Sequence, residues 1–251
     1  MITRAGKPPT AADGSRQRGV AVTEPPGPDY RQVRPVSDVK RRYEQLPSGR
    51  HGLLPGFVAA NQRERILSAV AQAIAELGYA EMSVEAIITR AGVSRRTFYE
   101  HFRNKEDAFL AAYDAALRAV VRHVRRAYLQ EPTAQARLRA GIGAFLQFLA
   151  SDPELARMCI VEVLAAGPRA LARRNEAMRV FAEIIEDNIH DLVPSCQRPE
   201  LTAETIVGGI HEVVFSRVLA GRTGELPGLA GDLLVAVLML DVDRQELSPG
   251  R

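Results

Sequence analysis

Residues 83–105, SVEAIITRAGVSRRTFYEHFRNK, decide the fold that this sequence predicts. Ser83 is suited to cap a short helix, because its side-chain oxygen can accept a hydrogen bond from a free backbone N–H group of the first turn. Gly92 ends that helix, and Ser94 caps a second one. Two short helices joined by a glycine-containing turn are typical of a helix-turn-helix, whose second helix enters the major groove of DNA. The spacing therefore predicts a helix-turn-helix at about 83–102, although any hairpin of two helices shares it.

The flanking segments are also expected to be helical. Upstream, apolar residues at helical spacing form one face from Ile66 to Leu77, and Gly78 then provides a stop. Downstream, Asn104 is a further N-cap, and similar spacing continues toward the C-terminus between breaks at prolines and glycines. Nothing reads as alternating strands joined by tight turns. The predicted fold class is all-α.

Three segments of the chain differ in composition and charge. Residues 1–57 are rich in Pro, Gly and Arg, lack sustained periodicity, and hold 10 Lys and Arg against 5 Asp and Glu. Residues 106–251 hold 16 against 20, within a net charge of +3 for the chain of 251 residues. We therefore expect a basic, largely disordered arm over 1–57, a DNA-binding domain over 58–106 and a helical domain over 107–251. The basic front indicates a polyanion as partner.

The outward-facing residues of the second short helix sharpen the hypothesis of DNA binding. Phe98 and Phe102 are four positions apart and are expected to point inward together. The remaining side chains then face outward: Arg95, Arg96, Thr97, Tyr99 and Lys105. Hydroxyls and cations are the groups that proteins use on phosphates and base edges. The free N–H groups near Ser94 also favour an anion.

Residues 66–114, ILSAVAQAIAELGYAEMSVEAIITRAGVSRRTFYEHFRNKEDAFLAAYD, closely resemble the DNA-binding domain of TetR-family transcriptional regulators. The match has no gap. It rests on five elements: Gly78-Tyr79, Ser83, AGVS at 91–94, Thr97-Phe98-Tyr99 with Phe102, and Asn104-Lys105-Glu106. The resemblance implies an N-terminal three-helix DNA-binding domain followed by a helical ligand-binding and dimerisation domain.

The resemblance also implies roles for single residues. Thr97 and Tyr99 match residues that bind the DNA backbone, and Lys105 matches a phosphate-binding lysine. Arg95 and Arg96 occupy variable positions at which sequence is read, where a bidentate contact to guanine discriminates by about 1–3 kcal/mol. The predicted DNA-binding residues, with the two helix caps included, are Ser83, Ser94, Arg95, Arg96, Thr97, Tyr99, His101 and Lys105.

These assignments have plainer alternatives. Thr97, Tyr99 and Lys105 can be ordinary helix surface. Arg95 and Arg96 can form a solvated charged face. His101 matches a frequent DNA contact but fits equally well beside Phe102. Arg50 and His51 form a possible minor-groove arm of the kind that homeodomains use. A disordered basic tail with only non-specific attraction to DNA is an equal alternative.

The acidic C-terminal region is expected to bind an effector and a second copy of the chain. In the family that the sequence resembles, the last two long helices form the dimer, and a small molecule enters a pocket among the central helices. The candidate pocket residues are Phe145, Phe148, Met158, Val161, Glu162, Phe181 and Ile184. For Glu162 a structural acid, paired with an arginine or facing solvent, is the favoured alternative. The candidate dimer residues, with an intramolecular core as the alternative, are Ile206, Ile210, Val214, Val218, Leu234 and Val237.

The sequence thus predicts a homodimeric transcriptional regulator, a repressor released from double-stranded DNA at a palindromic operator by an unknown small-molecule effector. The alternatives are an activator, an effector-independent regulator, or an all-α enzyme or adaptor that uses the helix-turn-helix for protein contacts. No enzyme, cofactor or metal site is expected, because HEVVF at 211–215 lacks the second histidine of a zinc motif. Two cysteines are too few for a disulfide framework, and no apolar run suits a membrane span or a secretory signal. We expect a cytoplasmic protein with no membrane partner.

Overall fold

The computed structural model describes residues 55–192, 194 and 196–239. Within these ranges every element is an α-helix or a 3-10 helix, which confirms the all-α fold for this part of the chain. The predicted arm, with Arg50 and His51, lies outside the described residues except at its end, since α1 (Pro55–Glu81) begins slightly before the expected domain start at residue 58. No helix among the described residues combines the length and the apolar character that crossing a membrane requires.

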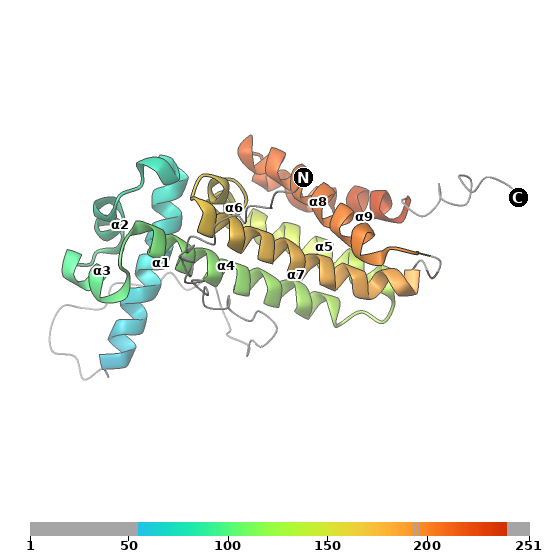
Figure 1. The fold of residues 1–251 in the computed structure, drawn as a ribbon, viewed down its shortest axis with the longest axis horizontal. Coiled ribbons are helices and arrows are strands. Elements are labelled where there is room, and N and C mark those ends of the chain that lie inside the picture. Colours follow the sequence, from blue (N-terminus) through green and yellow to red (C-terminus); the bar gives the residue numbers. More distant parts are fainter. Residues whose placement is uncertain (1–54, 193, 195, 240–251) are drawn as a thin grey trace, which may run out of the picture.

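Three helices form a compact unit at one end of the molecule (Figure 1). They are α1, α2 (Val84–Ala91) and α3 (Arg95–His101). Ser83 and Ser94 cap α2 and α3 as predicted, and each side-chain oxygen accepts the backbone N–H three residues on, at 3.1 and 3.0 Å. Gly92 lies between the two helices with φ 59°, the left-handed conformation that favours glycine, and so turns the chain.

The backbone of α1 leaves helical geometry at Gly78, the residue predicted to end the first helix. Its φ is 73° and its ψ is 164°, and a short second helical segment follows it to Glu81. Met82 N–H donates to the Gly78 carbonyl at 3.1 Å, which closes the last turn. Only glycine adopts this φ without strain, so Gly78 interrupts the helix as its residue type predicts.

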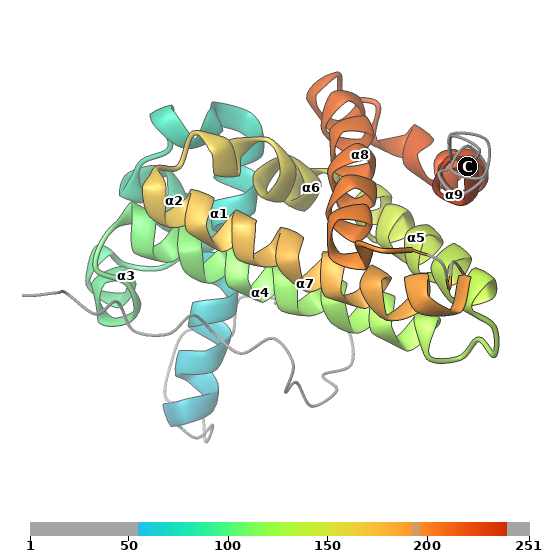
Figure 2. The same cartoon turned by 45° about the vertical axis from the view of Figure 1, so that its right-hand side comes forward.

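The other helices extend away from this unit. In chain order they are α4 (Lys105–Tyr128), α5 (Ala134–Ser151), α6 (Pro153–Ile160), η1 (Glu162–Leu164), α7 (Pro168–Leu192), α8 (Pro199–Leu219), η2 (Thr223–Leu229) and α9 (Ala230–Met239). In Figures 1 and 2, α4, α5 and α7 run along the length of the molecule, and α6 lies beside the three-helix unit. α8 packs on α7, and α9 packs on α5.

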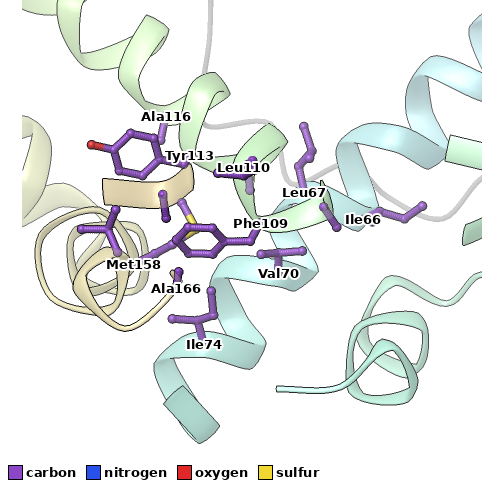
Figure 3. Close-up of a cluster of buried hydrophobic side chains, with 14 of the residues drawn as sticks. Ile66, Leu67, Val70, Ile74, Phe109, Leu110, Tyr113, Ala116, Met158 and Ala166 are labelled. Atoms are coloured by element: carbon purple, nitrogen blue, oxygen red, sulfur yellow. The ribbon is translucent and has the colours of Figure 1, made fainter. Parts of the chain in front are cut away.

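A shared apolar core joins the three-helix unit to the rest of the chain. Figure 3 shows Phe109 of α4, which is fully buried, between Val70 and Ile74 of α1 and Met158 of α6. A second cluster joins α5, α6, α7, α8 and α9 around residues such as Leu146. The first cluster thus crosses from α1 through α4 into α6 and α7.

Candidate DNA-binding surface and effector cavity

Two phenylalanines fix α3 against the three-helix unit. Phe98 and Phe102 are 0% and 4% exposed, and their ring centroids lie 5.8 Å apart. The guanidinium group of Arg63 on α1 lies over the Phe102 ring at 5.4 Å. His101 is half-buried, and the centroid of its ring lies 6.2 Å from that of Phe102. This position fits the alternative in which His101 packs beside Phe102. The opposite face of α3 is thereby turned to solvent.

The two candidate base-reading arginines are both paired with glutamates. Arg95 Nη2 donates to Glu85 Oε2 at 2.7 Å, and Arg96 Nε donates to Glu100 Oε1 at 3.0 Å. The Arg96 side chain is 90% exposed, so solvent screens its pair strongly. Both pairs are exposed and screened by solvent, so either arginine can leave its glutamate at little cost.

The hydroxyl groups predicted to meet the DNA backbone lie on the same exposed surface. Tyr99 is 50% exposed. The Thr97 hydroxyl lies 2.9 Å from the Ser94 hydroxyl, which already accepts the Thr97 N–H. Ser83 and Ser94 thus have a structural role as helix caps. Each hydroxyl oxygen can still accept a second hydrogen bond, but the capping bond restricts the rotation of the side chain.

Lys105 holds the end of α1 in this structure. Its Nζ donates to the backbone carbonyls of Tyr79, Ala80 and Met82 at 3.2, 3.0 and 2.9 Å, and it lies 5.0 Å from the centroid of the Tyr79 ring. An ammonium group has three donors, and all three are used here. The expected phosphate contact therefore requires one of these carbonyls to give way.

Two contacts that position the helix-turn-helix were missed by reasoning from the sequence. Arg65 of α1 donates to the carbonyls of Ala91 and Gly92 in the turn, and Arg90 of α2 forms an ion pair with Glu76 of α1. Both join residues that are distant in sequence and lie on polar faces. Helical periodicity reports only the apolar face, so it contains no signal for these contacts.

An apolar cavity of about 110 Å³ lies among α4, α5, α6, α7 and α8. Its wall includes Tyr113 and Tyr128, which lie on the same helix, so the cavity runs for about 22 Å along α4 at a rise of 1.5 Å per residue. Most of the wall is aliphatic or aromatic. The length and the lining suit a long apolar molecule.

Few polar groups reach this cavity. At one place Arg174 Nη2 lies 3.5 Å from His211 Nδ1, and burial together with the Arg174 charge lowers the pKa of His211 to about 4. Elsewhere Arg137 lies over the Tyr128 ring at 5.9 Å from its centroid, and Asn188 donates to the Tyr128 hydroxyl. His211 is therefore neutral near pH 7, and the arginines are the charged groups of the wall.

Four of the seven predicted pocket residues line this cavity: Phe145, Phe148, Phe181 and Ile184. Met158 and Val161 do not. Met158 is 1% exposed and packs around Phe109 in the first core cluster, while Val161 packs against the second cluster. The error has a geometric cause: α6 faces the cavity with Leu155, Cys159 and Ile160, and Met158 lies on its other side, toward α1.

Glu162 also lies away from the cavity. Its Oε1 pairs with Arg157 at 3.0 Å, its Oε2 accepts the backbone N–H of Tyr79 at 2.9 Å, and the residue is 8% exposed. A Cβ added at Gly78 would lie 3.4 Å from this carboxylate. The acid is thus structural, as the favoured alternative stated, and it joins η1 to the end of α1.

The six residues predicted for the dimer interface are mostly internal in the single chain. Four of them are 0–5% exposed: Ile206, Val214, Val218 and Leu234. Ile210 lines the cavity and Val237 is half-buried. An internal core and a dimer interface both require apolar residues at helical spacing. The spacing alone therefore does not distinguish core residues from interface residues. The large apolar residues exposed on α8 and α9 are Leu201, Leu219 and Val235.

The described residues hold no cluster of three or more His, Cys, Asp or Glu side chains with the arrangement of a metal site. Cys159 lies in the cavity wall, and burial raises the pKa of its thiol to about 12. A thiol with such a pKa is neutral and unreactive near pH 7.

The sequence is similar to those of known bacterial regulatory proteins. Residues 66–112 match the family described as bacterial regulatory proteins, tetR family. The chain is 25% identical over 175 residues to the fatty acid metabolism regulator protein of Bacillus subtilis, which covers 68% of this chain and 90% of that protein. It is 27% identical over 158 residues to the HTH-type transcriptional activator FasR of Mycolicibacterium smegmatis, with 63% of this chain and 70% of that protein covered.

Solved structures share the fold. The fatty acid degradation regulator FadR from Bacillus halodurans superposes with a TM-score of 0.65 at 23% identity, over 70% of this chain and 94% of that one. The transcriptional regulator FadR from Bacillus subtilis in complex with stearoyl-CoA superposes with a TM-score of 0.64 at 24% identity, over 69% and 96% of the two chains. These likenesses confirm an N-terminal helix-turn-helix unit followed by a helical domain.

Proposed function

Because this chain belongs to the tetR family of bacterial regulatory proteins, we propose that it is a homodimeric repressor that a small molecule releases from a palindromic operator. One observation carries the proposal. The exposed face of α3, with Arg95, Arg96 and Tyr99, and the apolar cavity are joined by the buried cluster around Phe109. Occupation of the cavity can therefore change the position of α3, and DNA and effector lower each other's affinity by the same factor.

The proposed DNA contacts follow from exposure and chemistry. Arg95 and Arg96 are the proposed base readers, and Thr97 and Tyr99 the proposed backbone contacts. A two-fold dimer presents two such helices, which is why the operator is expected to be palindromic. The proposed dimer surface is the outer side of α8 and α9 with the exposed Leu201, Leu219 and Val235. Mutual burial of these side chains removes apolar surface that one chain leaves in water.

The effector is proposed to be a molecule with a long alkyl chain. Aromatic and aliphatic side chains wall a cavity that runs for about 22 Å along α4. A similar protein of the same fold, FadR from Bacillus subtilis, was solved in complex with stearoyl-CoA. An acyl-CoA or the corresponding fatty acid is therefore the first compound to test.

The test is fluorescence anisotropy of the purified chain on the DNA upstream of its own gene, beside a shuffled duplex, over a salt series. The wild type is expected to prefer the upstream DNA at physiological salt, and stearoyl-CoA is expected to weaken that binding. Thr97→Ala/Tyr99→Ala and Arg96→Ala are expected to bind more weakly. Arg139→Ala removes the same charge from an exposed position on α5 and is the matched control.

The outcomes separate the alternatives. Unchanged affinity in Thr97→Ala/Tyr99→Ala would contradict the assigned surface. Tighter DNA binding with stearoyl-CoA would favour an activator, which is how the similar FasR is described. If no duplex selected from the genome is bound in preference to random DNA, the helix-turn-helix serves protein contacts instead.

A further inference from the structure

Arg174 lies in the wall of the cavity, and its guanidinium is incompletely paired within the protein. It lies on α7, its Nε is buried without a hydrogen-bond partner, and its Nη1 donates to the Asn175 side-chain oxygen at 3.3 Å. Its remaining polar neighbour is His211, and no carboxylate of the described residues forms an ion pair with it. A buried guanidinium N–H without an acceptor is costly, so this group is expected to receive an acceptor from the ligand.

His211 completes a site for an anion. An arginine only donates hydrogen bonds, so Nδ1 of His211 must be the acceptor in its contact with Arg174. That assignment places the ring proton on Nε2, where it is available to a second acceptor. Because the ring is neutral near pH 7, the pair has one positive charge and several donors in an otherwise apolar wall.

The polar groups toward the other end of the cavity have partners within the protein, except Asn188 Oδ1, a buried acceptor without a donor that disfavours an anion. Arg137 Nε donates to the Glu131 carbonyl at 3.0 Å and its guanidinium lies over the Tyr128 ring. The Tyr128 hydroxyl accepts from Asn188. Asn188 and Arg174 lie on the same helix, about 21 Å apart along its axis at 1.5 Å per residue. The cavity thus has a guanidinium with an unpaired N–H toward one end, and an unpaired amide oxygen beside an arginine bonded to the backbone toward the other.

We propose that Arg174 and His211 bind the anionic group of an amphiphilic effector whose alkyl chain extends through the cavity toward Tyr128. This inference rests on the proposed function of the cavity as an effector site. The anionic group is a carboxylate or a phosphate, the oxygen anions for which a guanidinium fork is suited. A fatty acid provides a carboxylate, and a coenzyme A ester provides phosphates.

The experiment is isothermal titration of the full chain with three compounds of the same chain length: stearate, stearoyl-CoA and uncharged stearyl alcohol. The wild type is expected to bind at least one of the two anions more than about tenfold tighter than the alcohol, equivalent to about 1.4 kcal/mol. Arg174→Met keeps an unbranched apolar stem without the charged guanidinium group and is expected to reduce that preference about tenfold. Arg137→Met is the matched control and is expected to retain it.

Each result decides the proposal. A preference for stearate identifies a carboxylate and a preference for stearoyl-CoA alone identifies a phosphate; both support the site. Equal affinity for the alcohol, or a preference lost in Arg137→Met and kept in Arg174→Met, overturns the site and leaves the apolar cavity as an effector site. Binding of none of the three overturns the proposed effector class as well. If Arg174→Met does not fold, Arg174→Lys and Arg174→Gln replace it, and only the lysine variant is expected to keep the preference.

Discussion

Glu162 and Tyr79, 83 residues apart in the chain, are joined by a hydrogen bond of 2.9 Å from the Tyr79 N–H to Glu162 Oε2. The bond joins η1, which follows the cavity-lining helix α6, to the end of α1 just after the kink at Gly78. On the other side of Tyr79, Lys105 contacts both its ring and its carbonyl oxygen. The end of α1 is thus held from the effector domain and from the start of α4 at once.

Removal of the Glu162 carboxylate is expected to destabilise the chain and to weaken the coupling between its two sites. Glu162→Ala leaves a backbone N–H unpaired, at about 1–3 kcal/mol. That loss lowers Tm by about 2–4 °C per kcal/mol in a chain of this size. Glu162→Gln retains an acceptor and is expected to lose less. Thermal unfolding measures the first effect, and DNA affinity with and without effector measures the second.

Glu154→Ala is the matched control for this prediction, because Glu154 is an exposed acid on α6. A Tm for Glu162→Ala equal to that of Glu154→Ala would show that the hydrogen bond to Tyr79 contributes nothing.

The two glutamates that pair with the base-reading arginines are expected to restrain DNA binding. Glu85→Gln and Glu100→Gln each release an arginine and remove a negative charge from the DNA-binding surface. Because both pairs are exposed and screened by solvent, the gain in DNA affinity is expected to be small but in the same direction for both variants. Anisotropy at low salt measures it, with Glu81→Gln, an exposed acid at the end of α1, as control. Weaker binding of both variants would mean that the glutamates position the arginines instead.

Lys105→Met is expected to destabilise the free protein. The substitution removes three hydrogen bonds to carbonyls and a contact with the Tyr79 ring, so the free energy of unfolding should fall by about 1–3 kcal/mol. Urea unfolding without DNA measures this. An unchanged midpoint would contradict the structural role. In the folded variant, a salt dependence of DNA affinity reduced by about one phosphate would show that Lys105 also binds DNA.

Local features were predictable from the sequence because their causes are local. Ser83, Ser94 and Asn104 cap the helices that follow them, and Gly92 turns the chain, as the residue types indicate. Phe98 and Phe102 are buried together because four positions make one helical turn. The aromatic residues of α5 and α7 reached the cavity for a similar reason, since those helices present one face to the interior.

Contacts between distant elements were not predictable. The sequence shows that Glu162 is a lone acid in an apolar stretch but not that Tyr79 N–H faces it. Ile206 and Val214 are apolar at helical spacing, yet whether such a face meets the same chain or a second copy depends on helices elsewhere in the fold. Arg174 belongs to a run of charges that reads as a solvated face, and only the packing of α8 on α7 brings His211 beside it.

The ring of His211 is expected to make the stability of the effector domain depend on pH. Burial and the neighbouring Arg174 hold the folded-state pKa at about 4, below the ordinary value of 6.5. The unfolded chain therefore takes up the proton first as the pH falls. The stability that the neutral ring provides is complete above pH 6.5 and is lost between 6.5 and 4. His211→Gln cannot titrate, so the wild type should lose on the order of 1 kcal/mol more than this variant over that interval, after allowance for partial exposure of the ring. Urea unfolding at pH 7 and pH 4.5 measures the difference, and parallel losses in both proteins would show that the ring is solvated when folded.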